Sequence, residues 1–148
     1  MPKAMEGREG ILAQMTSKAI ETLSRDKDGF FLMVEGSMID WGAHAKDFPY
    51  TVTEVIDLDM AVNIAKGFAD KDGKTLIVIT ADHETGGLTL PAGDMKSHKI
   101  FSNFIQSGNH TGVMVPIFSY GPGAERFSGI HDNTFFLNEF LGLLRINK

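Results

Sequence analysis

Three runs of apolar residues, each about as long as a β-strand, alternate along this chain with segments of helical periodicity. The apolar runs span residues 30–34, 75–80 and 113–120, and the helical segments span residues 9–25, 57–69 and 133–146. Strands that alternate with helices favour an α/β fold whose sheet is largely parallel. Uniformly apolar strands also fit a sheet that helices cover on both faces. The order of elements therefore predicts a partial three-layer α/β/α fold with a mostly parallel sheet.

Length, composition and charge restrict the kind of protein further. A chain of 148 residues suits one domain, and 43% hydrophobic with 22% charged residues is a globular balance. The formal net charge of -5, without a basic block, argues against a nucleic-acid partner. No apolar run approaches the roughly 18–20 residues that span a bilayer, and the first ten residues lack the apolar core of a signal peptide. We therefore expect one domain over residues 1–148, with no nucleic-acid or membrane partner.

The chain contains no cysteine, which excludes disulfides and thiolate metal sites. Any metal must be held by His, Asp, Glu and water. Those ligands suit zinc, magnesium or manganese, but not iron–sulfur clusters.

Metal-capable side chains gather around the ends of the three apolar runs. In open α/β sheets, ligands bind beyond the carboxyl ends of the strands. Glu35, Asp40 and His44 follow the first run, Asp82 and His83 follow the second, and His110 precedes the third. In a parallel strand, His110 would lie at the wrong end. It reaches the same edge only if the third strand runs antiparallel, or if His110 ends a loop that crosses the site.

Each of these residues also has a simpler structural interpretation. Asp40 and His44 lie four residues apart, so they share one helix face, yet a surface Asp–His pair has the same spacing. Asp82 and His83 fit a turn, and His110 fits a loop histidine.

Two further residues lie beside these candidates. Glu35 comes directly behind an apolar run, so we expect it to be partly buried and to need a cation or hydrogen bonds. Trp41, the only tryptophan, lies near any site that Asp40 forms. Taken together, three histidines and three acids at strand ends are the ligand set of hydrolytic zinc and magnesium sites.

Three segments, VEGSMIDWGAH, ITADHETGG and NHTG, resemble in this order the metal-binding motifs of the alkaline phosphatases. The ending IFSYGPGAERFSGIHDNTFFLNEFLGLL resembles the C-terminal strand, loop and helix of that family. The resemblance covers nearly the whole chain from about Glu9 onward. An Asp-His pair alone recurs across the wider phosphatase and sulfatase superfamily, whereas Glu35 followed by Asp40 and His44 narrows the resemblance to the alkaline phosphatases.

The resemblance implies two zinc ions and one magnesium ion as cofactors. Asp40, His44 and His110 would bind the first zinc, Asp82 and His83 the second zinc, and Glu35 the magnesium. Trp41 would lie close to the substrate phosphate, where a tryptophan cannot supply a cation. The implied activity is hydrolysis of phosphate monoesters by a homodimeric, periplasmic or secreted protein.

Four parts of the family's active site have no counterpart in this chain. They are the serine nucleophile in its Asp-Ser-Ala type motif, the arginine that binds phosphate, the aspartate shared by the second zinc and magnesium, and the hydroxyl ligand of magnesium. The resemblance therefore implies a C-terminal fragment that contains no catalytic nucleophile. The segment between His83 and His110 is short, so the family's crown insertion is expected to be absent or minimal.

Two other interpretations stay open from the sequence. The chain could be a stand-alone metal-binding α/β module without activity. It could also belong to another branch of the superfamily, such as the phosphodiesterases or sulfatases. In the interpretation as a C-terminal fragment, a cut sheet edge predicts self-association.

Overall fold

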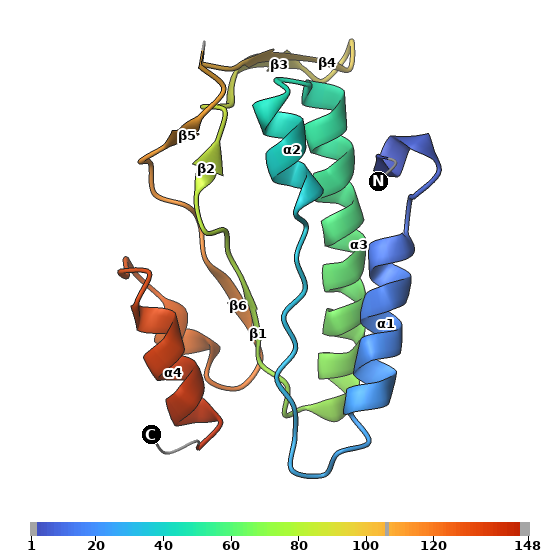
Figure 1. Ribbon diagram of the computed structural model, residues 1–148, viewed down its shortest axis with the longest axis vertical. Helices are drawn as coiled ribbons and strands as arrows, with labels where there is room; N and C mark the ends of the chain where they lie inside the picture. The colour runs from blue at the N-terminus through green and yellow to red at the C-terminus, as the bar shows by residue number, and fades with distance from the viewer. Residues whose placement is uncertain (1–2, 106, 146–148) are drawn as a thin grey trace.

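The computed structural model describes residues 3–105 and 107–145. Within these residues, the helices and strands follow one another as an α/β chain (Figure 1). In order they are the 3-10 helix η1 (Ala4–Glu6), α1 (Ile11–Leu23), α2 (Met38–His44), α3 (Phe48–Asp72), β1 (Ile77–Ile79), β2 (Glu84–Thr85), β3 (Thr89–Asp94), β4 (Lys99–Asn103), β5 (His110–Thr111), β6 (Phe118–Tyr120), the 3-10 helix η2 (Ala124–Phe127) and α4 (Phe135–Leu143). Helices α1, α2 and α3 lie on one side of β1 and β6, and α4 lies on the other (Figure 1). The expected α/β class is confirmed. The expected end of the last helix at Ile146 lies outside the described residues.

Helix α3 is much longer than the expected segment 57–69. It begins after Asp47, whose carboxylate accepts a hydrogen bond from the Tyr50 N–H, and Pro49 occupies the first turn. It ends at Gly73, whose φ of 67° is left-handed. Its first half buries Glu54 and Asp57. These two carboxylates interrupt the apolar periodicity, which is why the sequence pattern shows only the second half of the helix.

The two buried carboxylates of α3 bind the N-terminal segment. Arg8, which is 8% exposed, pairs with both Glu54 and Asp57, and the Gly10 N–H donates to Asp57. The Ala4 N–H donates to Glu54 at 2.7 Å. Burial alone would lower the pKa of the Arg8 guanidinium, but hydrogen bonds and the charges of Glu54 and Asp57 raise it above its ordinary value. This network holds η1 and the start of α1 against α3.

The segment that was expected as the first strand, residues 30–34, is extended but pairs with no strand in the part of the chain that the structure describes. Phe30 packs against Phe68 of α3 with ring centroids 6.2 Å apart, and Phe31 packs against Phe140 of α4 at 5.6 Å. Consecutive side chains therefore point to opposite helix layers, as they do in a β-strand. The segment lies in the sheet layer between α3 and α4, and it runs in the same direction as β1 (Figure 1).

All ladders in the described residues are antiparallel, so the expected mostly parallel sheet is not found there. β1 pairs with β6, with Ile77 opposite Tyr120 and Ile79 opposite Phe118. β2 pairs with β5 and β3 pairs with β4, also antiparallel. Residues 30–34 run in the same direction as β1 but form no ladder with it, so the parallel direction is present without parallel pairing (Figure 1).

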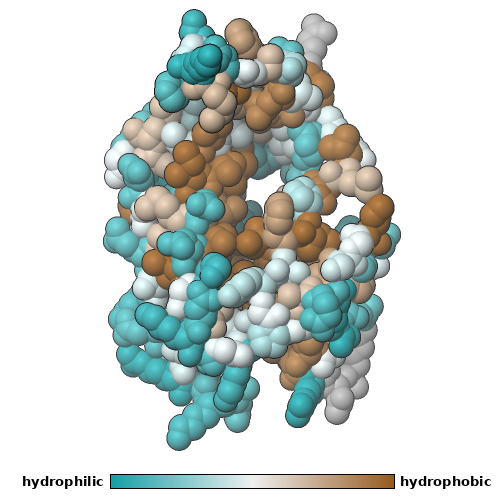
Figure 2. Space-filling model, turned by 180° about the vertical axis from the view of Figure 1, so that it is seen from behind, coloured by the Kyte–Doolittle hydropathy of each residue, from teal (hydrophilic) through white to brown (hydrophobic). Residues whose placement is uncertain are grey.

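The sheet layer, in which residues 30–34 form no ladder, leaves apolar side chains in contact with solvent. Phe31, Met33 and Phe118 are 58%, 69% and 60% exposed. Figure 2 shows an open hollow bordered by hydrophobic side chains. No helix in the described ranges is long and apolar enough to cross a membrane.

We expect the isolated chain to self-associate and to bind an apolar dye, because exposed apolar faces and unpaired backbone attract a second chain. Met33→Glu should reduce both effects, since it places a charge in this sheet layer. Met95→Glu is the matched control, because Met95 is 89% exposed on the turn between β3 and β4. Light scattering measures the association. A monomer at high concentration without dye binding would contradict the expectation.

Candidate metal centre

Helix α2 places Asp40 and His44 on one face, as the four-residue spacing predicts. Asp40 Oδ1 lies 3.5 Å from His44 Nε2. The other ring nitrogen of His44, Nδ1, lies 2.7 Å from the Gly108 carbonyl oxygen. A carbonyl can only accept, so Nδ1 carries the proton and Nε2 keeps a free lone pair. This is the tautomer that binds a metal through Nε2.

The short β2–β5 ladder brings His110 to the same place. Thr85 pairs with His110 and Glu84 pairs with Thr111. Side chains alternate along a strand, so Thr85 and His110 share one face of the ladder. On the other face, the Thr111 hydroxyl donates a hydrogen bond to Glu84.

Gly86 allows this ladder to approach α2. Its φ is 82°, and a Cβ at this position would lie 2.8 Å from the Ala43 carbonyl oxygen. A side chain would therefore both strain the backbone and collide with α2. The glycine that follows the Asp-His motif is explained by this close approach.

The direction of β6 settles how His110 reaches the site. β6 is antiparallel to β1, so its start lies beside the end of β1. The segment that precedes β6 and the segment that follows β1 therefore meet at one edge of the sheet. Of the two possibilities for His110, the antiparallel strand is confirmed.

The donor atoms of Asp40, His44 and His110 lie at distances that suit one ion. His110 Nε2 is 3.1 Å from His44 Nε2 and 3.5 Å from Asp40 Oδ1. Zinc–ligand bonds of about 2.0–2.1 Å in a tetrahedron put neighbouring donor atoms about 3.3–3.4 Å apart. The three donor–donor distances, 3.1–3.5 Å, lie close to this value, so the residues present would fit a tetrahedral zinc.

Asp82 and His83 form an adjoining pair of donors. Asp82 Oδ2 lies 3.2 Å from His83 Nε2, again close to a tetrahedral edge. The His83 ring stacks on the His110 ring with centroids 3.6 Å apart. Asp40, His83 and His110 each offer a donor atom within 4.8 Å of the others. The two sets of donors therefore touch, and His83 lies at their boundary.

Glu35 and Trp41 are both exposed to solvent. Glu35 is exposed, so the expected partial burial is wrong, and the reason is that residues 30–34 have no neighbouring strand to cover it. Among the described residues, the group with donor atoms within 4.8 Å of one another is formed by Asp40, His83 and His110, without Glu35, His44 or Asp82. Trp41 follows Asp40 on α2 and is 64% exposed.

Sequence reasoning missed Thr85. Its hydroxyl lies 2.5 Å from Asp40 Oδ1 and 3.2 Å from His83 Nδ1. Its position two residues after His83 was the signal available in the sequence.

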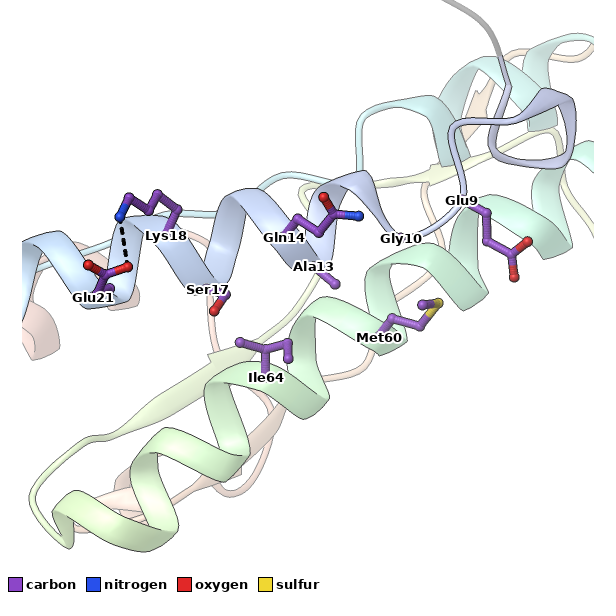
Figure 3. Close-up of a pocket in the computed structure, with 9 residues that line it drawn as sticks. All are labelled: Glu9, Gly10, Ala13, Gln14, Ser17, Lys18, Glu21, Met60 and Ile64. Atoms are coloured by element: carbon purple, nitrogen blue, oxygen red, sulfur yellow. Dashed lines mark hydrogen bonds and ion pairs between the residues drawn. The ribbon is translucent and has the colours of Figure 1, made fainter.

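An open groove of about 660 Å³ between α1 and α3 is separate from these residues (Figure 3). An ion pair between Lys18 and Glu21 lies at its edge, and Met60 and Ile64 of α3 line its floor. None of the candidate metal ligands lines it. The groove is therefore not part of the candidate metal centre.

The comparisons with known proteins agree on one family. The family model described as alkaline phosphatase matches residues 1–103. Alkaline phosphatase 4 of Bacillus subtilis is 32% identical over 203 aligned positions, which cover 93% of this chain and 44% of the relative. The structure of the alkaline phosphatase from the Antarctic bacterium TAB5 superposes with a TM-score of 0.91 at 42% identity, over 100% of this chain and 44% of that one. A variant of that enzyme with magnesium bound gives a TM-score of 0.91 at 40% identity, over 100% of this chain and 45% of the variant. The chain spans less than half the length of these proteins.

Proposed function

This chain belongs to the alkaline phosphatase family, and we propose that it is the C-terminal, metal-ligand-bearing part of an enzyme that hydrolyses phosphate monoesters. The observation that carries the proposal is the set of donor atoms from Asp40, His44 and His110, which lie 3.1–3.5 Å apart. The family membership adds the reaction class, and the donor chemistry without thiolates suits zinc.

The residues of this chain have distinct roles in the proposal. Asp40, His44 and His110 hold a first zinc, Asp82 and His83 contribute to a second, and Glu35 contributes to a magnesium site. Bound zinc supplies Lewis-acid stabilisation of phosphoryl oxygens and lowers the pKa of a coordinated water or hydroxyl. The His44 Nδ1–H bond to Gly108 keeps the ring in the metal-binding tautomer. Trp41, exposed beside Asp40, contacts the substrate side of the site.

The serine nucleophile is proposed to reside in a preceding segment of a longer polypeptide. The short coverage of the relatives supports this proposal, as does the absence of an Asp-Ser-Ala motif from this chain. The 203 aligned positions with the Bacillus relative exceed the 148 residues here, so the relative has residues without a counterpart in this chain. An absent or minimal crown insertion between His83 and His110 is a further part of the proposal. A homodimeric, exported parent enzyme is part of the same proposal.

A coding sequence upstream of Met1 that contains an Asp-Ser-Ala motif would support the fragment proposal. The mass of the native protein tests the same point. A native chain of this length would favour a stand-alone metal-binding module instead.

We expect the chain to bind about one zinc, at Asp40, His44 and His110, because this proposed site has three ligands in the chain, whereas the proposed second zinc site has two and the proposed magnesium site has one. His110→Ala should weaken zinc binding by more than about tenfold, since even the loss of a group that supports a ligand costs about 10–100-fold. His98→Ala is the matched control, because His98 is exposed on the β3–β4 turn. Isothermal titration measures both variants. Undiminished binding in His110→Ala would refute the assignment.

A further inference from the structure

We propose that the Thr85 hydroxyl is a positioning group that orients one ligand in each of the two zinc sites. The inference rests on the proposed function and extends it, because it names a residue that touches neither ion. Its evidence is one side chain, on β2, that contacts both Asp40 and His83.

The chemistry of the three groups fixes the direction of both hydrogen bonds. A threonine hydroxyl has one proton to donate and lone pairs to accept with. Asp40 Oδ1, 2.5 Å away, can only accept while the carboxylate is ionised, so the hydroxyl donates to it. At the 3.2 Å contact, His83 Nδ1 then donates to the Thr85 oxygen.

This pattern leaves His83 Nε2 without a proton. Nε2 is the atom that lies 3.2 Å from Asp82 Oδ2 in the second pair of donors. The Thr85 hydroxyl thus holds His83 in the metal-binding tautomer, as the Gly108 carbonyl does for His44. The same hydroxyl binds the Asp40 oxygen that faces both His44 and His110.

The fold fixes the position of Thr85 closely. Thr85 is half-buried and lies directly opposite His110 in the β2–β5 ladder. The next residue, Gly86, donates its N–H to Asn109 and lies against the Ala43 carbonyl of α2. A β-branched side chain has few rotamers. The hydroxyl is therefore held in place by the ladder before any metal binds.

Three variants of the full chain test the proposal. Thr85→Val keeps the shape of the side chain and removes the hydroxyl. Thr85→Ser keeps the hydroxyl. Thr111→Val is the matched control, because it removes a hydroxyl from the opposite face of the same ladder.

Two measurements are made on each variant. Isothermal titration with zinc gives the affinity, and Thr85→Val should weaken it by about 10–100-fold, the usual cost of losing a group that supports a ligand. Thr85→Ser should restore most of the affinity, and Thr111→Val should change it little. Nitrogen-15 NMR of the zinc-free chain gives the tautomer of His83, at a pH where the ring is neutral. The Nδ1–H form should dominate in the unmodified chain and decrease in Thr85→Val only.

The outcomes separate this proposal from the one on which it rests. Unchanged zinc affinity and an unchanged His83 tautomer in Thr85→Val would overturn the role of Thr85. Equal losses in Thr85→Val and Thr111→Val would overturn it too, because they would reflect the ladder rather than the hydroxyl. If the unmodified chain binds no zinc, the metal assignment fails, and the tautomer alone decides on Thr85. A shift in Thr85→Val then supports the proposal, and no shift refutes it.

Discussion

Turnover of a chromogenic phosphate monoester by this chain alone is expected to stay below an enzymatic, saturable rate at alkaline pH, even with zinc and magnesium added. The proposed parent reaction needs a serine nucleophile, and covalent catalysis fails without a positioned nucleophile. The phosphate-binding arginine, the bridging aspartate and the magnesium hydroxyl ligand are proposed to lie in the same preceding segment. The chain on its own keeps ligands but lacks the groups that react with the substrate or hold it.

The size of the expected loss follows from what single groups contribute. Removing one preorganised donor from a transition-state site commonly costs about 3–4 kcal/mol, or roughly a hundred- to a thousandfold in rate. Rate losses within one catalytic unit are not additive in free energy, so the losses expected for the four missing groups cannot be multiplied together. Even a single such loss, added to the absence of the nucleophile, would leave too little transition-state stabilisation for saturable turnover.

The assay is turnover measured against Asp82→Ala as the control. Turnover that survives in Asp82→Ala is independent of the second set of donors, and if it also survives in His110→Ala it comes from a contaminating phosphatase. Robust saturable turnover that Asp82→Ala abolishes would contradict the fragment proposal, and another residue of this chain would then serve as the nucleophile.

Features set by short-range spacing could be predicted from the sequence. The interval between Asp40 and His44 predicts a shared helix face, and α2 provides it. The Asp-His pair after an apolar run predicts a strand-end site, and Asp82 and His83 follow β1. Both features depend on residues that are close together in the sequence, so the local residue pattern encodes them directly.

Features set by partners distant in the chain could not be predicted in the same way. The antiparallel pairing of β1 with β6 joins segments about 40 residues apart, and apolar runs alone carry no direction. Glu35 looked partly buried because the sequence implied a covered strand, but covering needs neighbours that no local pattern supplies. The first half of α3 was missed because its face toward the N-terminal segment uses buried charge instead of apolar side chains.

The donors of the proposed first zinc site come together through contacts that this chain makes by itself. A Cβ at Gly42 would lie 2.8 Å from the Thr51 nitrogen, so α2 packs backbone to backbone on α3. Gly86 lets the β2–β5 ladder approach α2 just as closely. Asp40, His44 and His110 are therefore positioned by α2, α3 and one short ladder. This is the physical reason for expecting the isolated chain to bind zinc although it lacks phosphatase activity.

Arg8→Ala is expected to destabilise the fold by about 3–5 kcal/mol, the usual cost of removing one partner from a buried ion pair. Arg8 pairs with Glu54 and Asp57, which are 3% and 2% exposed. Most of the cost arises because two carboxylates would remain buried without a cation. Against a native free energy of unfolding of about 5–15 kcal/mol, this is a large share.

Urea unfolding measures the effect through a lower midpoint at an unchanged slope. The unfolding midpoint of Arg8→Lys should fall between those of the unmodified chain and Arg8→Ala, because a compact ammonium cannot bind both carboxylates with the fork of a guanidinium. Arg25→Ala, two residues after the end of α1, is the control, since Arg25 pairs with Glu21 in solvent and exposed pairs contribute little. A midpoint for Arg8→Ala equal to that of Arg25→Ala would mean that water reaches Glu54 and Asp57. The contact between α1 and α3 would then depend on apolar packing, and Ala61→Ser, at a position 2% exposed, would be the more damaging change.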